Sequence, residues 1–165
     1  MIGDWRIHCL AVLLSLLAAC ASGPTFDSSG VDHTLTPRRA AAQVQDASGK
    51  QVLWGGVILA ITNLRERTDI EVLGYPLGAD NRPRRDNDPL GRFIIRQAGY
   101  LEPASYSEGR LVTVAGTVSG ALPGRIGASD YAYPVVAARQ LYLWPRDSGY
   151  DGTSVHFGIG VGIGF

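Results

Sequence analysis

The sequence predicts an all-β fold, a small OB-fold-like β-barrel with short helical segments. Five segments rich in β-branched and apolar residues are separated by turn-forming residues, and a short helical segment lies between the third and the fourth. Glycines inside the strand segments favour closure of the sheet. An ordinary antiparallel sandwich has the same periodicity and is the alternative.

Short helical segments are expected at two places. Thr36 followed by Pro37 is typical of a helix N-cap with proline at the first helical position, so a helix should begin there and run over residues 38–43. A single helical turn is expected over residues 101–109, with Pro103 near its start and Gly109 at its end.

The expected strands are residues 51–63, 68–77, 92–97, 110–122 and 134–144. In the second, Ile70 and Val72 alternate with Asp69 and Glu71, which puts apolar and acidic side chains on opposite faces. Residues 80–83, 88–91 and 123–124 have the composition of turns. Four glycines are expected where a strand bends sharply or lies close to its neighbour: Gly55, Gly56, Gly116 and Gly120.

The first 20 residues are typical of a bacterial lipoprotein signal. The apolar run over residues 9–17 is too short to cross a bilayer as a helix, which needs about 20 apolar residues. It ends in Leu17-Ala18-Ala19-Cys20, a lipobox, in which the cysteine is acylated, for example with palmitate, and becomes the new N-terminus. An ordinary secretory signal with a chance cysteine is the alternative.

Four regions follow from this organisation: a signal peptide (1–19), a lipid-anchored flexible tether (20–34), a β-barrel domain (35–147) and a glycine-rich tail (148–165). In the tail, apolar residues alternate with glycine: Phe157, Ile159, Val161, Ile163 and Phe165. This predicts either a strand that seeks a sheet edge, the membrane or a barrel protein, or a flexible tail.

Composition excludes several kinds of site. The chain has 15 basic and 15 acidic residues, so it does not indicate nucleic acid as a partner. Cys9 would be removed with the signal and Cys20 acylated, which leaves no thiol for a disulfide or a cysteine metal site. No cofactor is indicated. Ala21, where an acidic residue would favour the inner membrane, favours the outer membrane.

Several short motifs resemble one lipoprotein family in order and spacing. They are VLWGGVI at 52–58, TDIEVL at 68–73, YPL at 75–77, RP at 82–83, GRF at 91–93, GRLVTV at 109–114 with Gly116, IG at 126–127, Tyr131, YPVV at 133–136 and LWP at 143–145. Together with the lipobox, they make the chain similar to the Slp-type starvation-inducible outer-membrane lipoproteins. The resemblance implies outer-membrane attachment and expression linked to starvation or envelope stress. It brings no catalytic residues.

Residues that carry chemistry are sparse. The histidines, at positions 8, 33 and 156, fall outside the expected strands, which removes nucleophilic triads and zinc sites of the nitrogen and sulfur type. The carboxylates are Asp69, Glu71, Asp80, Asp86, Asp88, Glu102, Glu108 and Asp130. A glycosidase needs two of them roughly 5–9 Å apart across a cleft. Most instead lie in turns, where a structural role is favoured.

One basic cluster is a candidate anion-binding site: Arg82, Arg84, Arg85, Arg92 and Arg96. Guanidinium groups bind phosphate through two parallel hydrogen bonds, so lipid headgroups are candidate ligands. The favoured alternative is a charged loop whose arginines and aspartates pair with one another. Five aromatic residues are expected to pack in the core or at its rim, with a ligand platform as the alternative: Trp54, Tyr75, Tyr131, Tyr133 and Trp144.

These observations predict a non-enzymatic outer-membrane lipoprotein that acts as a structural or stress-associated module of the envelope, anchored through Cys20 and facing the periplasm. Envelope proteins or anionic headgroups are the expected partners. The first alternative is a binding protein for an oligosaccharide, a peptidoglycan fragment or a lipid headgroup. The second is a cell-wall hydrolase with paired carboxylates.

Overall fold

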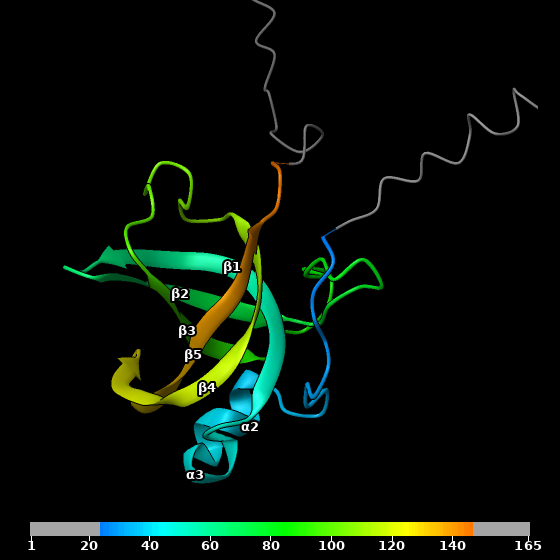
Figure 1. The fold of residues 1–165 in the computed structure, drawn as a ribbon. Coiled ribbons are helices and arrows are strands. Elements are labelled where there is room, and N and C mark those ends of the chain that lie inside the picture. Colours follow the sequence, from blue (N-terminus) through cyan, green and yellow to red (C-terminus); the bar gives the residue numbers. More distant parts are fainter. Residues whose placement is uncertain (1–23, 147–165) are drawn as a thin grey trace, which may run out of the picture.

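The computed structural model describes residues 24–146 (Figure 1). Each of the five strands expected from the sequence is present in it, with bounds that differ at several ends. Two short helices, α2 (Pro37–Ala42) and α3 (Val44–Ala47), precede the strands. The strands are β1 (Gln51–Asn63), β2 (Arg67–Tyr75), β3 (Gly91–Ala98), β4 (Leu111–Ile126) and β5 (Ser129–Leu143). The prediction of a mainly β fold with short helical segments is confirmed.

The five strands form a closed barrel in the order β1-β2-β3-β5-β4. The long β1 closes it, because its second half pairs with β2 and its first half pairs with β4, both antiparallel. β3 and β5 form the parallel contact, over residues 94–96 and 135–137. Beyond this contact, β4 and β5 pair only with each other and continue as a two-stranded ribbon to the tip at residues 127–128.

Several local predictions differ from the structure, among them the start of β5, which begins at Ser129 rather than at residue 134. The turn expected at Pro123 and Gly124 is wrong, because β4 continues through both residues to Ile126. Pro123 is tolerated since the ribbon has an open edge, where a missing N–H breaks no ladder bond. Residues 101–109 contain one helical hydrogen bond, from the Tyr106 amide to the Glu102 carbonyl (3.1 Å), but no helix.

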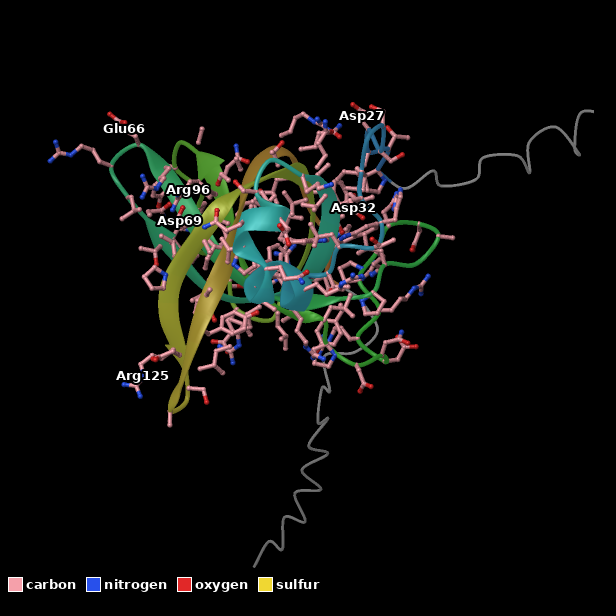
Figure 2. The ribbon with its side chains drawn as sticks, turned by 90° about the horizontal axis from the view of Figure 1, so that it is seen from below. Asp27, Asp32, Glu66, Asp69, Arg96 and Arg125 are labelled. Carbon is pink, nitrogen blue, oxygen red and sulfur yellow. The ribbon has the colours of Figure 1, made fainter. Side chains whose placement is uncertain are left out.

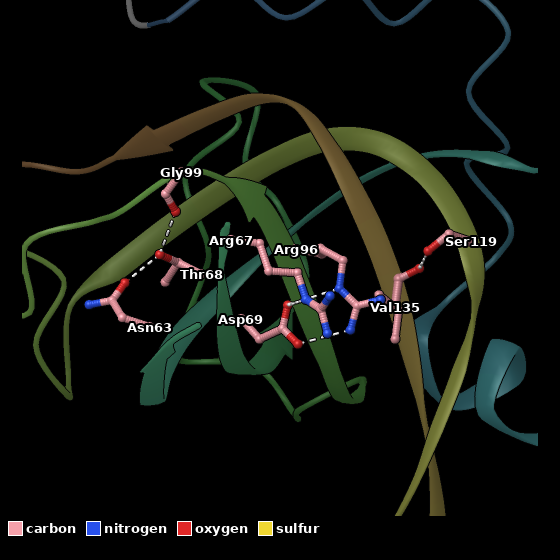
Figure 3. Close-up of polar contacts among 8 residues, drawn as sticks. All are labelled: Asn63, Arg67, Thr68, Asp69, Arg96, Gly99, Ser119 and Val135. Carbon is pink, nitrogen blue, oxygen red and sulfur yellow. Dashed lines mark hydrogen bonds and ion pairs between the residues drawn. The ribbon is translucent and has the colours of Figure 1, made fainter. Parts of the chain in front are cut away.

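The core lies inside the barrel and follows the alternation of each strand. Along β2, Thr68, Ile70 and Val72 are buried while the intervening residues are partly exposed. Phe93 and Ile95 of β3 continue this buried layer. Thr68 is polar, but the single proton of its hydroxyl has two acceptors within reach, the Gly99 carbonyl (2.9 Å) and the Asn63 side chain (Figure 3). The hydroxyl oxygen also accepts from the Leu101 amide (3.1 Å), so its burial leaves no hydrogen bond unmade.

Glycines permit close approach of neighbouring strands. A Cβ atom at Gly56 would lie 2.0 Å from the Leu73 carbonyl oxygen, and one at Gly116 would lie 2.2 Å from the Ala137 carbonyl oxygen. The expected close approach is therefore present at both positions. Gly120 differs, because it has a φ of 132° beside a register shift and serves as a bulge residue.

The helices α2 and α3 pack at one end of the barrel (Figure 1). The Thr36 hydroxyl accepts a hydrogen bond from the Arg39 amide (3.3 Å), and Pro37 occupies the first helical turn, as the sequence predicts. Ala40 and Ala47 are buried and belong to the barrel core. Small residues on these helices let the two short segments lie close against the strand ends.

The N-terminal segment is bound to the barrel from Asp27 onward, which differs from the expectation of a flexible tether up to residue 34. The Asp27 amide donates to the Gln140 side chain (3.0 Å), and Arg139 donates to the Asp27 carbonyl (3.3 Å). Further along, Val31 forms a parallel bridge with Gln51, and the Asp32 amide donates to the Gln51 carbonyl (2.9 Å).

The predicted signal peptide, Cys20 and the glycine-rich tail lie outside the described residues. No helix within residues 24–146 has the length and apolar character needed to span a membrane.

Candidate functional site

A pocket of about 380 Å³ lies between the N-terminal segment, the ends of β1 and β2, and the loop of residues 76–90. Its lining includes Asp32, His33, Leu53, Trp54, Leu77 and Leu90. Polar and apolar groups both face this space. The volume falls within the range of small-ligand sites, about 300–1,000 Å³.

The wall formed by β1 is an open strand edge. On its other side, β1 bonds to β4 through even-numbered residues: the Val118 amide donates to the Lys50 carbonyl, and the Ile58 amide donates to the Arg110 carbonyl (both 2.9 Å). Odd-numbered residues therefore turn their amide and carbonyl groups away from β4. Gln51 uses this side to bind Asp32, and pairing with β2 begins at Gly55. Leu53, between them, has no partner on this side among residues 24–146.

The opposite wall is a loop held by its own backbone. Leu77 bridges to Pro83, the Gly78 amide donates to the Arg82 carbonyl (2.9 Å), and the Arg84 amide donates to the Pro76 carbonyl (2.8 Å). At the end of the loop, the Leu90 amide donates to the Gly74 carbonyl (2.8 Å). These bonds return the chain to β3 and give the pocket a defined shape.

Two tryptophans support the pocket through their indole N–H groups. Trp54, 6% exposed, donates to the Leu35 carbonyl (2.8 Å) and so ties the N-terminal segment to β1. Trp144 donates to the Thr113 hydroxyl (2.9 Å), which donates to the Asn81 carbonyl in the loop (2.8 Å). Both rings are in packed positions, as the sequence favoured. The same holds for Tyr133, which is 8% exposed.

Tyr131 also has a packing role. Its hydroxyl accepts from the Arg92 amide (3.1 Å) and donates to the Arg92 carbonyl (2.9 Å), so it ties the β4–β5 ribbon to β3. Burial raises the pKa of the Tyr131 hydroxyl. Tyr75, at the end of β2, is half-buried and lines the pocket.

The five arginines do not form one group. Arg82, Arg84 and Arg85 lie in the loop of residues 76–90, whereas Arg92 and Arg96 lie on β3. In the loop, Arg84 pairs with Asp80 at 3.3 Å, and the Arg82 guanidinium lies 5.2 Å from the centre of the Trp144 ring.

On β3, the arginines face carboxylates of β2. Arg96 donates two hydrogen bonds to Asp69, both 2.9 Å (Figure 3). Arg92 contacts Glu71 at 2.8 Å. Arg67 adds a longer contact to Asp69 at 3.5 Å. The Arg96 guanidinium lowers the pKa of Asp69, and the paired carboxylates raise the pKa of Arg92 and of Arg96.

Figure 2 shows that Asp69 and Arg96 lie on one side of the barrel and Asp27 and Asp32 on the other. The two aspartates of the N-terminal segment have lowered pKa values, because Asp27 accepts hydrogen bonds from Ser29 and Asp32 accepts them from Thr34. The described part of the chain contains no group of three or more His, Cys, Asp and Glu side chains that could hold a metal ion.

The sequence contained a signal for the ion pairs between β2 and β3, but it contained none for the pocket. Asp69 and Glu71 were placed on one face of their strand, and the same alternation in β3 would have predicted their pairing with Arg92 and Arg96. The pocket itself had no local signal. Its walls come from three parts of the chain, residues 32–37, 53–55 and 74–90, which are each separated by about 20 residues of sequence. Asp32 and His33 also belong to a segment that the sequence predicts to be a tether.

Comparison with known proteins identifies the family. The chain is 38% identical over 103 residues to a protein of Haemophilus influenzae, and 30% identical over 113 residues to the lipoprotein YeaY of Escherichia coli. These matches cover 62% and 66% of the chain, but only 56% and 58% of the two relatives. A third match, to the outer membrane protein Slp of Escherichia coli, is 30% identical over 139 residues and covers 81% of the chain and 73% of the relative. The family profile matches residues 17–158, and the chain therefore belongs to the outer membrane lipoprotein Slp family.

Proposed function

We propose that this protein is a non-enzymatic binding module of the outer membrane, anchored by lipid at Cys20 and facing the periplasm, which holds an envelope ligand in the pocket beside β1. The candidate ligands are an oligosaccharide, a peptidoglycan fragment or a lipid headgroup. The observation that carries the proposal is the pocket of about 380 Å³, where the open backbone edge at Leu53 lies among apolar and polar side chains.

The strand order supports an OB-like barrel. The order β1-β2-β3-β5-β4 with a parallel β3–β5 contact is the arrangement expected of this fold. OB-folds bind extended ligands on an exposed face of the barrel. The helices stand before β1 here rather than between the third and fourth strands, so the likeness rests on the sheet alone.

Other candidate sites have weaker support. Arg92 and Arg96 are already paired with carboxylates, so an anion would have to displace Glu71 or Asp69 to reach them. The same ion pairs weigh against a hydrolase built on Asp69 and Glu71, since a catalytic acid needs a raised pKa and that of Asp69 is lowered.

Lipid anchoring is tested at Cys20. In cells supplied with a labelled fatty-acid analogue, the wild-type protein should take up the label and sediment with outer membranes, because acyl chains bind stably in the bilayer. Cys20→Ser should do neither, whereas Cys9→Ser should behave as wild type. A labelled Cys20→Ser protein in the membrane pellet would refute the anchor.

Ligand binding is tested by photo-crosslinking in intact cells. A diazirine amino acid at Leu77 lies in the pocket lining, and one at Ser129 lies on the exposed tip of the β4–β5 ribbon as a matched control. We expect a specific adduct from position 77, identified by mass spectrometry, and none from position 129. Adducts of the same kind and yield from both positions would contradict the proposed function.

A further inference from the structure

The pocket offers backbone hydrogen-bonding groups to a ligand. Two of its polar side chains are already bonded within the protein, because the Trp54 N–H donates to the Leu35 carbonyl (2.8 Å) and the Asp32 carboxylate accepts from the Thr34 hydroxyl (2.8 Å) and amide (3.0 Å). At Leu53, the N–H and the C=O both face away from β4, on the side where the pocket lies. A ligand can therefore meet one donor and one acceptor side by side.

Only one residue of this edge is open. The Gln51 carbonyl accepts from the Asp32 amide (2.9 Å), and Gly55 pairs with Tyr75. Because the bonding groups on one edge of a strand recur at every second residue, Leu53 is the single position between them. The stretch of β1 from Gln51 to Gly55 is about 13 Å long. It has room for one pairing residue of a ligand and a neighbour on either side.

One open residue selects a chemical class of ligand. The N–H and C=O of a strand residue are complementary to the C=O and N–H of one residue opposite, which exchange two hydrogen bonds in an antiparallel ladder. An amino-acid residue between two amide bonds offers both groups on the same side, and short peptides bind to other sheet edges in this way.

The other two candidate ligands match the pocket less well. A phosphodiester only accepts hydrogen bonds, so it would leave the Leu53 carbonyl unpaired. Within residues 24–146, no lysine or arginine lines the pocket, and Asp32 would repel an anion. A sugar ring would lack an aromatic face at Trp54, which is 6% exposed and packs edge-on against Phe93 at 5.2 Å.

The pocket also limits the size of the bound side chain. Gly55 and Leu53 share one face of β1, and a Cβ at Gly55 would lie 2.9 Å from the side chains of Leu77 and of Pro83. The loop of residues 76–90 thus lies close over this face beside Leu53. A residue paired with Leu53 places its side chain on one face of the strand, beside that of Leu53 or opposite to it. On the face that the loop covers, only a small apolar side chain has room.

We infer that the pocket binds one alanine-sized residue of a short peptide, held by two backbone hydrogen bonds to Leu53. This inference rests on the function proposed above and narrows its ligand to the peptide part of a peptidoglycan fragment. A free short peptide carries the same chemistry, so the two sources are distinguished by experiment.

The smallest probe is N-acetyl-alanine N-methylamide, a single residue between two amide bonds. Added near saturation to the full lipidated protein in detergent micelles, it should shift the Leu53 amide resonance and slow its hydrogen exchange at least fivefold. The Trp54 amide, which faces β4, should exchange at an unchanged rate. Methylation of the alanine nitrogen removes the donor and should weaken binding at least tenfold, and a tryptophan side chain on the same backbone should do likewise. Equal affinity for the methylated probe would overturn the inference.

A protein variant places the binding in the pocket. Leu77→Trp fills the lining and should abolish the shift at Leu53, whereas Leu64→Trp, at a residue that is 44% exposed and outside the lining, should preserve it. Circular dichroism shows whether each variant is folded. If Leu77→Trp is unfolded, the comparison between the methylated and unmethylated probes still decides, because it uses the wild-type protein. A folded Leu77→Trp protein that binds the probe as the wild type does would refute the assignment to this pocket.

Four further ligands separate the sources and the two proposals: a peptidoglycan disaccharide, the same disaccharide with its peptide, the peptide alone, and glycerol phosphate. If the disaccharide with its peptide binds at least tenfold tighter than the peptide, peptidoglycan is the source, and equal affinities assign a free peptide. Saturable binding of the disaccharide or of glycerol phosphate in the pocket, without a response at Leu53 to either peptide ligand, overturns this inference and leaves the proposed function standing. If none of the four binds and the probe at position 77 captures nothing in cells, both proposals fail.

Discussion

Gly56→Ala should destabilise the barrel by separating β1 from β2. The added Cβ would lie 2.0 Å from the Leu73 carbonyl oxygen and 2.7 Å from its carbon, whereas real Cβ atoms essentially never come closer than 3.0 Å. The two strands would therefore have to move apart by about 1 Å. A side-chain rotation cannot relieve this clash, because the Cβ is fixed to the backbone of residue 56 and its neighbour is the backbone carbonyl of Leu73. Overpacking of this kind costs about 3 kcal/mol, and for a domain of this size that lowers the melting temperature by about 10 °C.

The assay is thermal unfolding followed by circular dichroism, with the signal peptide and Cys20 removed so that the protein is soluble. Two controls isolate the cause. Ala60→Val enlarges an exposed residue of the same strand and should change stability by less than about 0.5 kcal/mol. Gly127→Ala has open space but a φ of 61°, so it should cost only about 1 kcal/mol of backbone strain. If the Gly56→Ala protein has the same melting temperature as the wild type, the close-approach argument is refuted.

Two further predictions concern polar contacts. Asp69→Asn should lower stability by about 1 kcal/mol at pH 7, since it weakens the two hydrogen bonds from Arg96. The folded pKa of Asp69 is lowered, so this contribution is complete above its unfolded pKa and is lost as the pH falls through the folded value. The stability difference from wild type should therefore shrink in acid as the carboxyl of the wild-type protein becomes protonated. Thr113→Val should cost about 2 kcal/mol in urea unfolding, because the buried Trp144 N–H and the Asn81 carbonyl both lose their partner.

Each of these has a matched control. Asp130→Asn removes a carboxylate that is 98% exposed and lies 3.8 Å from Arg125, and it should leave stability unchanged at every pH. Thr117→Val makes the same substitution on the same strand at a half-buried position and should cost less than about 0.5 kcal/mol. If the variant at position 69 or 113 matches its control, the corresponding contact contributes nothing to stability.

The strands were predictable because their signals are local. Alternation in β2 and the β-branched run of β1 depend only on neighbouring residues, and the bounds of β1 are those expected. The same is true of the N-cap at Thr36, where a hydroxyl and a following proline are sufficient. The end of β4 was missed for a physical reason, since proline and glycine stop a strand inside a sheet but not at the open edge of a ribbon.

The pocket was not predictable because it depends on register. Residues 32 and 33 meet residues 77 and 90 only because Val31 pairs with Gln51 and because β2 leaves β1 at Tyr75. A shift of either pairing by one residue would turn Leu53 to the other face or close the edge. No local pattern determines where two strands part.

The attachment of Asp27 to the barrel sets a working distance. Only six residues separate Asp27 from Cys20, and the seven peptide links between them extend to about 25 Å. If Cys20 carries the lipid, as proposed above, the side of the barrel that carries Arg139 and Gln140 stays within that radius of the membrane surface. The protein would then sample a thin layer along the membrane rather than the depth of the periplasm, and it would meet molecules that diffuse in or on the outer membrane far more often than those free in solution.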